Sequence, residues 1–204
     1  MRDQTIRAIR WERPITGWLK LNTDSSSLGN PGLAARGGVI RDGNGNWVVG
    51  FLRKIGNTSS FMAKLWALRD GLLICVNHNY SAVEVEADAK VVIDVLANPR
   101  QSNNFILSIL DYCRQLASQI PQICFSYCNR EANKCANFMA RKGTHQNEDF
   151  CLFENPPVGL NDLLAFDRSG MYLNRRCLVN IFSLSYFLCY YLFYPKKKKK
   201  MMHV

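Results

Sequence analysis

Alternating apolar and polar residues predict three strands in the first part of the chain. Trp18–Thr23 places Trp and Leu on one face and Lys and Asn on the other, and a loop is expected over Ser25–Gly32. Gly37–Arg41 and Trp47–Arg53 are rich in Val, Ile, Phe and Trp. They are joined by Asp42–Asn46, whose Asp-Gly and Asn-Gly pairs suit a tight hairpin. We therefore expect an antiparallel meander.

Further along, the apolar positions change to helical spacing. A long helix is expected to start at Ser59 or Ser60 as N-cap and to end near His78 and Asn79. The later elements are a strand over 83–87, helices over 91–96 and 105–120, a strand over 123–128 and a helix over 131–142. This order predicts an α/β fold, with helices packed against a mixed sheet.

The length of 204 residues suits one domain with tails. Residues 1–16 have no clear period and are interpreted as a lead-in segment. The domain is expected over 17–143. Residues 144–170 form a C-terminal extension that we expect to pack across the domain, and residues 171–204 form an apolar and lysine-rich tail.

The tail has two interpretations that the sequence leaves open. Residues 178–194 carry no charge and are close to the shortest length that spans a bilayer, which favours a tail anchor. The lysines at 196–200 would then lie on the translocated side, against the usual charge bias. Alternatively, residues with A/T-rich codons followed by a lysine run are what translation beyond the proper end of a reading frame would give.

Charge and cysteine content narrow the partners and the compartment. Five of the ten net positive charges come from 196–200, so the rest of the chain carries +5, which suits nucleic acid without demanding it. The eight cysteines form no C-x-x-C pair, and no secretory signal precedes Arg10. We therefore expect a reducing intracellular compartment, nucleus or cytoplasm, with neither disulfides nor a zinc site.

Two aspartates end predicted strands. Asp24 follows the first strand beside a turn rich in Ser, Gly, Asn and Pro, and Asp88 follows the strand over 83–87. Carboxylates at the ends of core strands are where metal-assisted active sites are commonly assembled.

Five segments in order carry a family resemblance: KLNTDSSSLGNPG, GGVIRDGNGNWVVGF, AKLWALRDGL, VEVEADAKVV and REANKCANFMAR. The chain resembles the ribonuclease H type 1 domain, in the variant abundant in plant genomes and plant retroelements, strongly over 17–143 and more weakly to 170. The resemblance implies a five-stranded mixed sheet, three antiparallel strands and then two more, flanked by helices. It also implies an endonuclease that cuts the RNA strand of an RNA-DNA hybrid with two divalent ions held by four carboxylates.

The resemblance places Asp24 and Asp88 at the first and third family carboxylates. Lys64 stands at the second position, in place of a glutamate, and Asn137 at the fourth, in place of an aspartate. An amide still offers a neutral oxygen, whereas an ammonium removes a ligand and adds a positive charge where a cation would bind. Lys64 could instead pair with Asp24 or Asp88 and take the place of the ion.

We therefore expect a ribonuclease H-like domain that binds hybrid or duplex nucleic acid weakly and has lost, or strongly reduced, cleavage. Mg²⁺ or Mn²⁺ would be needed only by an active form. Two alternatives remain: an active hybrid ribonuclease in which Asp24 and Asp88 hold a single ion, and a membrane-tethered interaction module.

Three further positions follow from the resemblance. Asn30 matches the family loop that touches the sugar edge of the RNA, where the 2′-hydroxyl distinguishes RNA from DNA. Tyr127 stands where the family often has a mobile histidine. His145 comes after the last helix and is interpreted as an ordinary loop histidine.

Overall fold

The computed structural model describes residues 4–97, 104–178 and 190–191. The strands are β1 (Gln4–Ile9), β2 (Leu19–Gly29), β3 (Gly32–Arg41), β4 (Trp47–Thr58), β5 (Ala82–Ala87), β6 (Gln122–Tyr127), β7 (Phe150–Phe153), β8 (Leu173–Leu178) and β9 (Tyr190–Tyr191). The α-helices are α1 (Ser60–Asn77), α2 (Lys90–Ala97), α3 (Asn104–Ala117), α4 (Lys134–Gly143) and α5 (Asn161–Arg168), and Arg130–Ala132 form a 3₁₀ turn.

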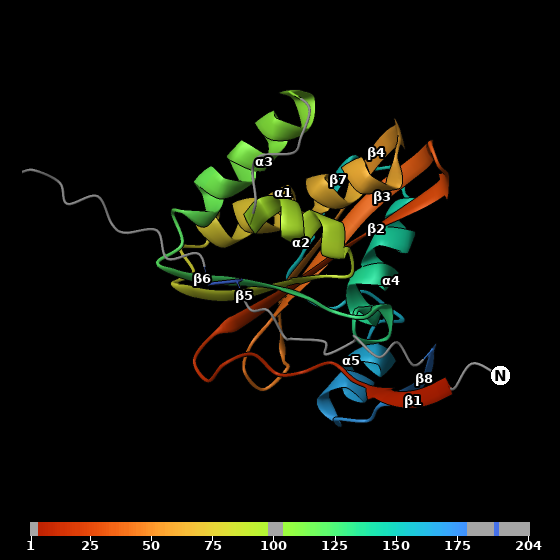
Figure 1. The fold of residues 1–204 in the computed structure, drawn as a ribbon. Helices are drawn as coiled ribbons and strands as arrows, with labels where there is room; N and C mark the ends of the chain where they lie inside the picture. Colours follow the sequence, from red (N-terminus) through yellow and green to blue (C-terminus); the bar gives the residue numbers. More distant parts are fainter. Residues whose placement is uncertain (1–3, 98–103, 179–189, 192–204) are drawn as a thin grey trace, which may run out of the picture.

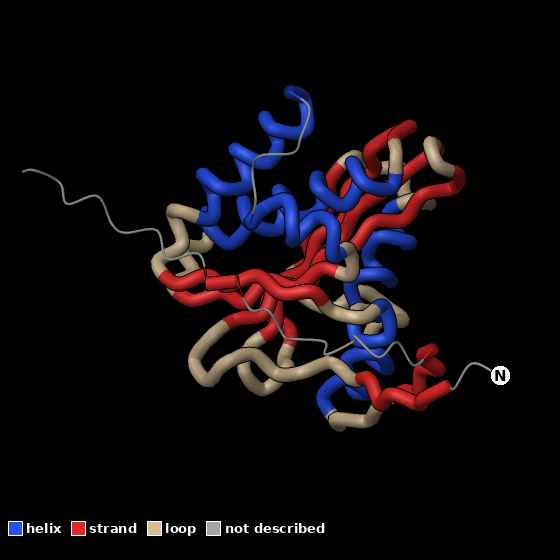
Figure 2. The backbone as a smooth tube through the Cα atoms, in the orientation of Figure 1, coloured by secondary structure: helices blue, strands red, loops and turns tan. Residues whose placement is uncertain are grey.

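The main sheet has the strand order β7-β4-β3-β2-β5-β6-β9 (Figures 1 and 2). Strands β2, β3 and β4 form an antiparallel meander, and β5 and β6 continue from β2 in parallel. This confirms the predicted five-stranded mixed sheet. Strands β7 and β9 extend it antiparallel at its two edges and were not predicted.

Two predicted boundaries are wrong. The segment Ser25–Gly32, expected as a loop, is mostly strand, because Ser25–Ser27 continue the ladder against Ala34–Arg36. Its polar residues lack the alternation that marks a strand with one buried face. The last helix was expected from Glu131 but begins at Lys134, after the 3₁₀ turn.

Helices cover both faces of the sheet (Figure 1). Neighbouring residues of a strand point to opposite faces. Accordingly, Ile40 and Phe51 belong to the core beneath α1, α2 and α3, whereas Val39 and Leu52 belong to a smaller core with α4 and α5. The long helix starts as predicted, with the Ser59 hydroxyl accepting a hydrogen bond from the Met62 amide.

Within the segment interpreted as a lead-in, residues 4–9 and Trp11 belong to the folded structure. Strand β1 pairs antiparallel with β8 in a second, two-stranded sheet. Trp11 is buried and its ring lies against the Arg41 guanidinium, 3.8 Å from the ring centroid to Cζ. Arg41 in turn donates to Asp167 of α5 at 2.7 Å. A segment before β2 and the helix α5 thus meet at Arg41 of the central strand β3.

Within the described ranges, no helix is long and apolar enough to cross a membrane. The segment 178–194, for which a tail anchor was one of two interpretations, lies almost wholly outside these ranges. The cysteines that the structure describes form no disulfide.

Candidate active site

Asp24 and Asp88 stand side by side because each directly follows the last residue of the parallel pairing between β2 and β5. In the register of β2 and β5, Thr23 lies opposite Ala87, so Asp24 and Asp88 lie at the same level, where the parallel pairing ends and β2 continues only against β3. The carboxyl ends of parallel strands are where open α/β sheets place their sites. Both aspartate side chains are deeply buried, with 3% and 2% of their surfaces exposed.

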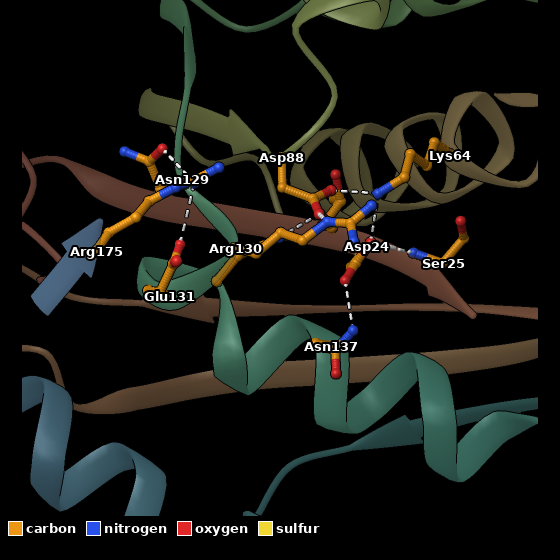
Figure 3. A network of polar contacts seen from close by, with 11 residues as sticks. Asp24, Ser25, Lys64, Asp88, Asn129, Arg130, Glu131, Asn137 and Arg175 are labelled. Atoms are coloured by element: carbon orange, nitrogen blue, oxygen red, sulfur yellow. Dashed lines mark hydrogen bonds and ion pairs between the residues drawn. The ribbon is translucent and has the colours of Figure 1, made fainter. Parts of the chain in front are cut away.

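Lys64 joins the two carboxylates (Figure 3). It lies in the second turn of α1, and its Nζ donates to Asp24 Oδ1 at 2.7 Å and to Asp88 Oδ1. Only 15% of its side chain is exposed. The ammonium therefore sits between the carboxylates as a covalently tethered cation.

The other two carboxylate oxygens are also occupied. Asn137 Nδ2 donates to Asp24 Oδ2 at 2.9 Å, and Arg130 Nε lies 3.2 Å from Asp88 Oδ2 (Figure 3). Asn137 reaches Asp24 because α4 packs unusually close to β3 at Gly37, the residue opposite Asp24, where a Cβ would lie 2.6 Å from the Ala140 nitrogen.

The site is electrically balanced, since two carboxylates face one ammonium and one guanidinium. Burial raises the pKa of Asp24, Lys64 and Asn137 oppose this shift, and Asp88 adds to it. Burial on its own would lower the pKa of Lys64, but Asp24 and Asp88 outweigh it and the pKa rises above the ordinary value. Lys64 thus stays charged at neutral pH.

The family model described as Reverse transcriptase-like matches residues 22–143, well over half of the chain, including Asp24, Lys64, Asp88 and Asn137. The chain belongs to this family. Its domain is of the ribonuclease H type, which confirms the resemblance drawn from the five sequence segments.

Similar proteins agree with this assignment. The ribonuclease H1 of the halophilic archaeon Halobacterium salinarum matches with a TM-score of 0.59 at 25% identity, covering 62% of this chain and 97% of that one. LC11-RNase H1, solved in complex with an RNA/DNA hybrid, matches with a TM-score of 0.57 at 22% identity, covering 62% and 96%.

The curated relative is an Arabidopsis thaliana protein named "Putative ribonuclease H protein", 33% identical over 170 residues and 83% of this chain. The match covers 27% of that protein, so the chain spans about a quarter of the length of this relative.

The residues of this ribonuclease H-like site do not fit the two divalent ions that the family implies. The described residues contain no cluster of three His, Cys, Asp or Glu side chains that could hold a metal. Asp70 is held by Arg36 at 2.5 Å and by Arg69 at 2.9 Å, and Glu86 is held by Lys20 at 2.7 Å. Neither carboxylate can turn toward Asp24 without leaving its partner unpaired.

Three further residues were named from the family motif or its surroundings. The Asn30 side chain accepts a hydrogen bond from the Ser60 amide at 3.1 Å and so caps the start of α1. Tyr127 ends β6 with 39% of its surface exposed. His145 is exposed just after α4. A contact of Asn30 with a ribose stays a prediction.

Arg130 and Arg175 are the site residues that sequence reasoning missed. Arg175 of β8 donates to Asn129 Oδ1 at 3.0 Å and to Glu131 Oε2 at 3.3 Å, on both sides of Arg130 (Figure 3). Arg130 opens the motif REANKCANFMAR, and its place just before Asn137's helix was the available signal. Arg175 lies 44 residues from Glu131 in sequence, so no local pattern indicates the contact.

Proposed function

We propose that this chain is a ribonuclease H-like nucleic-acid-binding domain whose cleavage of RNA-DNA hybrids is lost or strongly reduced. The observation that carries the proposal is the position of Lys64 Nζ, which contacts both Asp24 and Asp88.

The chemistry of hybrid cleavage requires what this site lacks. Two hard cations close together need several anionic oxygens to offset their repulsion and to fix their geometry. Here three of the four oxygens of the Asp24 and Asp88 carboxylates already accept hydrogen bonds, and the fourth, Asp88 Oδ2, is ion-paired with Arg130 Nε. A lysine ammonium donates hydrogen bonds but does not bind and acidify a water molecule as a metal ion does. It therefore balances the charge of the carboxylates without supplying an attacking nucleophile.

Binding does not require the same residues as cleavage. A site with four carboxylates and no metal would repel a phosphate backbone, whereas Asp24, Asp88, Lys64 and Arg130 sum to zero charge. The structural relative LC11-RNase H1 was solved with a hybrid bound, and this chain shares its fold. We propose the same partner here, bound weakly because no divalent ion bridges protein and phosphate.

Cleavage of an end-labelled RNA-DNA hybrid in Mg²⁺ or Mn²⁺ tests the proposal. The double variant Lys64→Glu, Asn137→Asp should cleave at least about 100-fold faster than wild type, because it restores the two missing carboxylates. The same variant with Asp24→Asn added should be inactive. Lys54→Glu, the same charge change at an exposed residue of β4, should behave as wild type.

A wild-type rate equal to that of the double variant would overturn the loss of activity. If wild type cleaves only in Mn²⁺ and Asp24→Asn abolishes this cleavage, the chain is instead an active ribonuclease with altered metal use.

A further inference from the structure

Three arginines gather around one buried carboxylate on the face of the sheet that α1 covers. Arg36 of β3 donates to Asp70 Oδ2 at 2.5 Å, and Arg69 of α1 donates to Asp70 Oδ1 at 2.9 Å. The Nε of Arg53, on β4, lies 3.8 Å from Asp70 Oδ2. These three side chains, Arg36, Arg53 and Arg69, are called the arginine cluster below.

The strand register places the arginine cluster on a single face of the sheet. Arg36 and Arg53 lie directly opposite each other in the antiparallel pair of β3 and β4, so their side chains point to the same side. Arg53 also lies opposite Phe150 of β7, the edge strand beside β4 (Figure 1). Trp66, which contacts the cluster from α1, is about 200° around that helix from Lys64. The cluster is therefore separate from the candidate active site.

The arginine cluster carries more positive charge than Asp70 can balance. The ion pairs of all three arginines end on Asp70, so three guanidinium groups face one carboxylate and two positive charges remain. Both Asp70 oxygens already accept hydrogen bonds from Arg36 and Arg69. Arg53 Nε, in contrast, is a buried donor without a hydrogen-bond partner among the described residues. Because buried donors are nearly always paired, this one points to an acceptor from outside the chain.

The like charges of the arginine cluster also weaken one another. Arg36 and Arg53 face each other directly on the ladder, which destabilises a strand pair when both residues carry the same charge. Burial lowers the pKa of Arg36, Asp70 opposes this shift, and the two other arginines add to it. An anion bound among the three guanidinium groups would remove this repulsion.

Aromatic rings lie against the arginine cluster on two sides. The Trp66 ring centroid lies 5.3 Å from Arg36 Cζ and 4.3 Å from Arg69 Cζ, and the Phe150 centroid lies 4.5 Å from Arg53 Cζ. Such contacts stabilise a guanidinium but add no negative charge. Phe150 is 38% exposed and the Arg53 side chain 33%, so solvent reaches the cluster at this edge. Arginine beside an exposed ring suits a nucleotide, whose phosphate pairs with the cation and whose base stacks.

We propose that the arginine cluster binds a phosphate monoester, as carried by a nucleotide or by the end of a nucleic-acid strand. Such a group carries about 1.5 to 2 negative charges at neutral pH, which matches the two unbalanced positive charges. Its oxygens accept paired hydrogen bonds from guanidinium groups, so Arg53 Nε would gain an acceptor. Phe150 would lie beside the base. This inference goes beyond hybrid binding at Asp24 and Asp88 and does not rest on it.

Binding of a 5′-phosphorylated single-stranded DNA of about eight nucleotides tests the proposal, measured by isothermal titration calorimetry on the full chain in EDTA. Wild type should bind this strand at least about tenfold more tightly than the same strand without the phosphate. Arg53→Gln should abolish the difference. The matched control Lys54→Gln removes an exposed charge from the next residue of β4 and should keep the difference.

Thermal unfolding separates binding from a purely structural role of Arg53. Sodium phosphate at about ten times its dissociation constant should raise the Tm of wild type by about 3–6 °C over NaCl of equal ionic strength, and should not raise that of Arg53→Gln. In NaCl alone, Arg53→Gln should melt no lower than wild type, because it removes one of two facing charges. A lower Tm in NaCl together with an unchanged response to phosphate would show that Arg53 acts only in the fold.

A second variant keeps the test decisive if Arg53→Gln does not fold. Arg53→Lys keeps the charge but lacks the Nε donor and the planar guanidinium, so it should lose most of the preference for the phosphorylated strand. Full retention of the preference in Arg53→Lys would overturn the role of Arg53 Nε.

The remaining outcomes decide what carries the phosphate. Equal binding of the two strands by wild type, or equal preference in Arg53→Gln and Lys54→Gln, would overturn the proposal. Tighter binding of adenosine 5′-monophosphate than of inorganic phosphate would support a nucleotide, and equal binding would make free phosphate the ligand. A phosphoserine peptide that binds as tightly as the phosphorylated strand would refute the nucleotide. Failure to bind a hybrid would refute the proposed function and leave this test intact, because the probe is a single strand.

Discussion

Removing the Lys64 ammonium should convert a site whose counter-charge is carried by the chain itself into one that needs a divalent cation for full stability. In Lys64→Ala, Asp24 and Asp88 remain side by side where the pairing of β2 and β5 ends, deeply buried and without the cation that separates them. The two carboxylates then repel each other, and each loses a charged hydrogen-bond donor.

The size of the effect follows from the geometry. An ammonium 2.7 Å from a carboxylate oxygen gains about 6 kcal/mol at an effective dielectric constant of about 20. Desolvation of the buried ions offsets much of this gain, and deleting one partner of a buried pair commonly costs about 3–5 kcal/mol. Because Lys64 keeps 15% of its side-chain surface exposed, we expect the lower end, about 3 kcal/mol. In a domain of this size that lowers Tm by about 6–12 °C.

The assay is thermal unfolding at pH 5 and pH 8, with and without 10 mM MgCl₂, against NaCl of equal ionic strength. The loss of stability in Lys64→Ala should be smaller at pH 5, because burial raises the pKa of Asp24 and its protonation removes one of the two facing charges. Mg²⁺ should stabilise Lys64→Ala by about 1.4 kcal/mol if it binds with a dissociation constant of about 1 mM. Wild type should not respond, because its own ammonium already occupies the position.

Two controls decide the interpretation. Lys54→Ala removes an exposed lysine and should leave Tm and the response to Mg²⁺ unchanged. Lys64→Ala combined with Asp24→Asn removes the excess negative charge and should lose the response to Mg²⁺. If Lys64→Ala melts with wild type, or if Mg²⁺ stabilises both equally, Lys64 does not act as the internal cation.

Two further predictions concern the buried ion pairs. Asp167→Ala should destabilise the fold by about 3–5 kcal/mol in urea titrations, because it leaves the Arg41 guanidinium buried without its carboxylate. The control Asp162→Ala, at an exposed position of the same helix, should cost under about 1 kcal/mol. Equal losses of stability in the two variants would refute the role of the pair. For Lys64, whose folded-state pKa lies above the ordinary value of 10.5, the stability from its pairing is fully present below that pH and is lost as the pH rises through the folded-state pKa. The difference in unfolding free energy between wild type and Lys64→Met should therefore narrow above about pH 10.5, and a difference that stays constant would contradict this. Lys20 titrates alike in both proteins, so its contribution to the difference cancels.

The central sheet and its helices could be predicted because their apolar faces are periodic and their turns carry Gly and Asn. Two stretches that escaped prediction as strands lack such a face. Thr5–Ala8 are exposed on successive positions, and Ser25–Ser27 are polar, so neither stretch alternates. The partner of β1 lies at residues 173–178, too far along the chain for any local pattern to indicate the pairing.

The pairing of Lys64 with the aspartates could be anticipated because the family pattern assigns all of these residues to one site. The family pattern could not indicate how the main chain and distant segments of the chain place the side chains of the site. Asn137 reaches Asp24 only because Gly37 lets α4 approach β3, and Arg130 is held by a turn that Arg175 contacts from β8. These are packing relations between segments, and they follow from the fold as a whole.

The balance of charge explains how such a site can persist without metal ligands. Parallel pairing of β2 and β5 forces Asp24 and Asp88 together, so some cation must lie between them whether or not the chain cleaves nucleic acid. An ammonium carried on α1 meets that need within the chain, and Arg130 completes it from the other side. Restoring Glu at position 64 therefore does two things at once: it returns a ligand and it removes the internal counter-charge. The Lys64→Glu, Asn137→Asp variant should accordingly be less stable than wild type in EDTA and regain that stability in Mg²⁺, a dependence that wild type lacks.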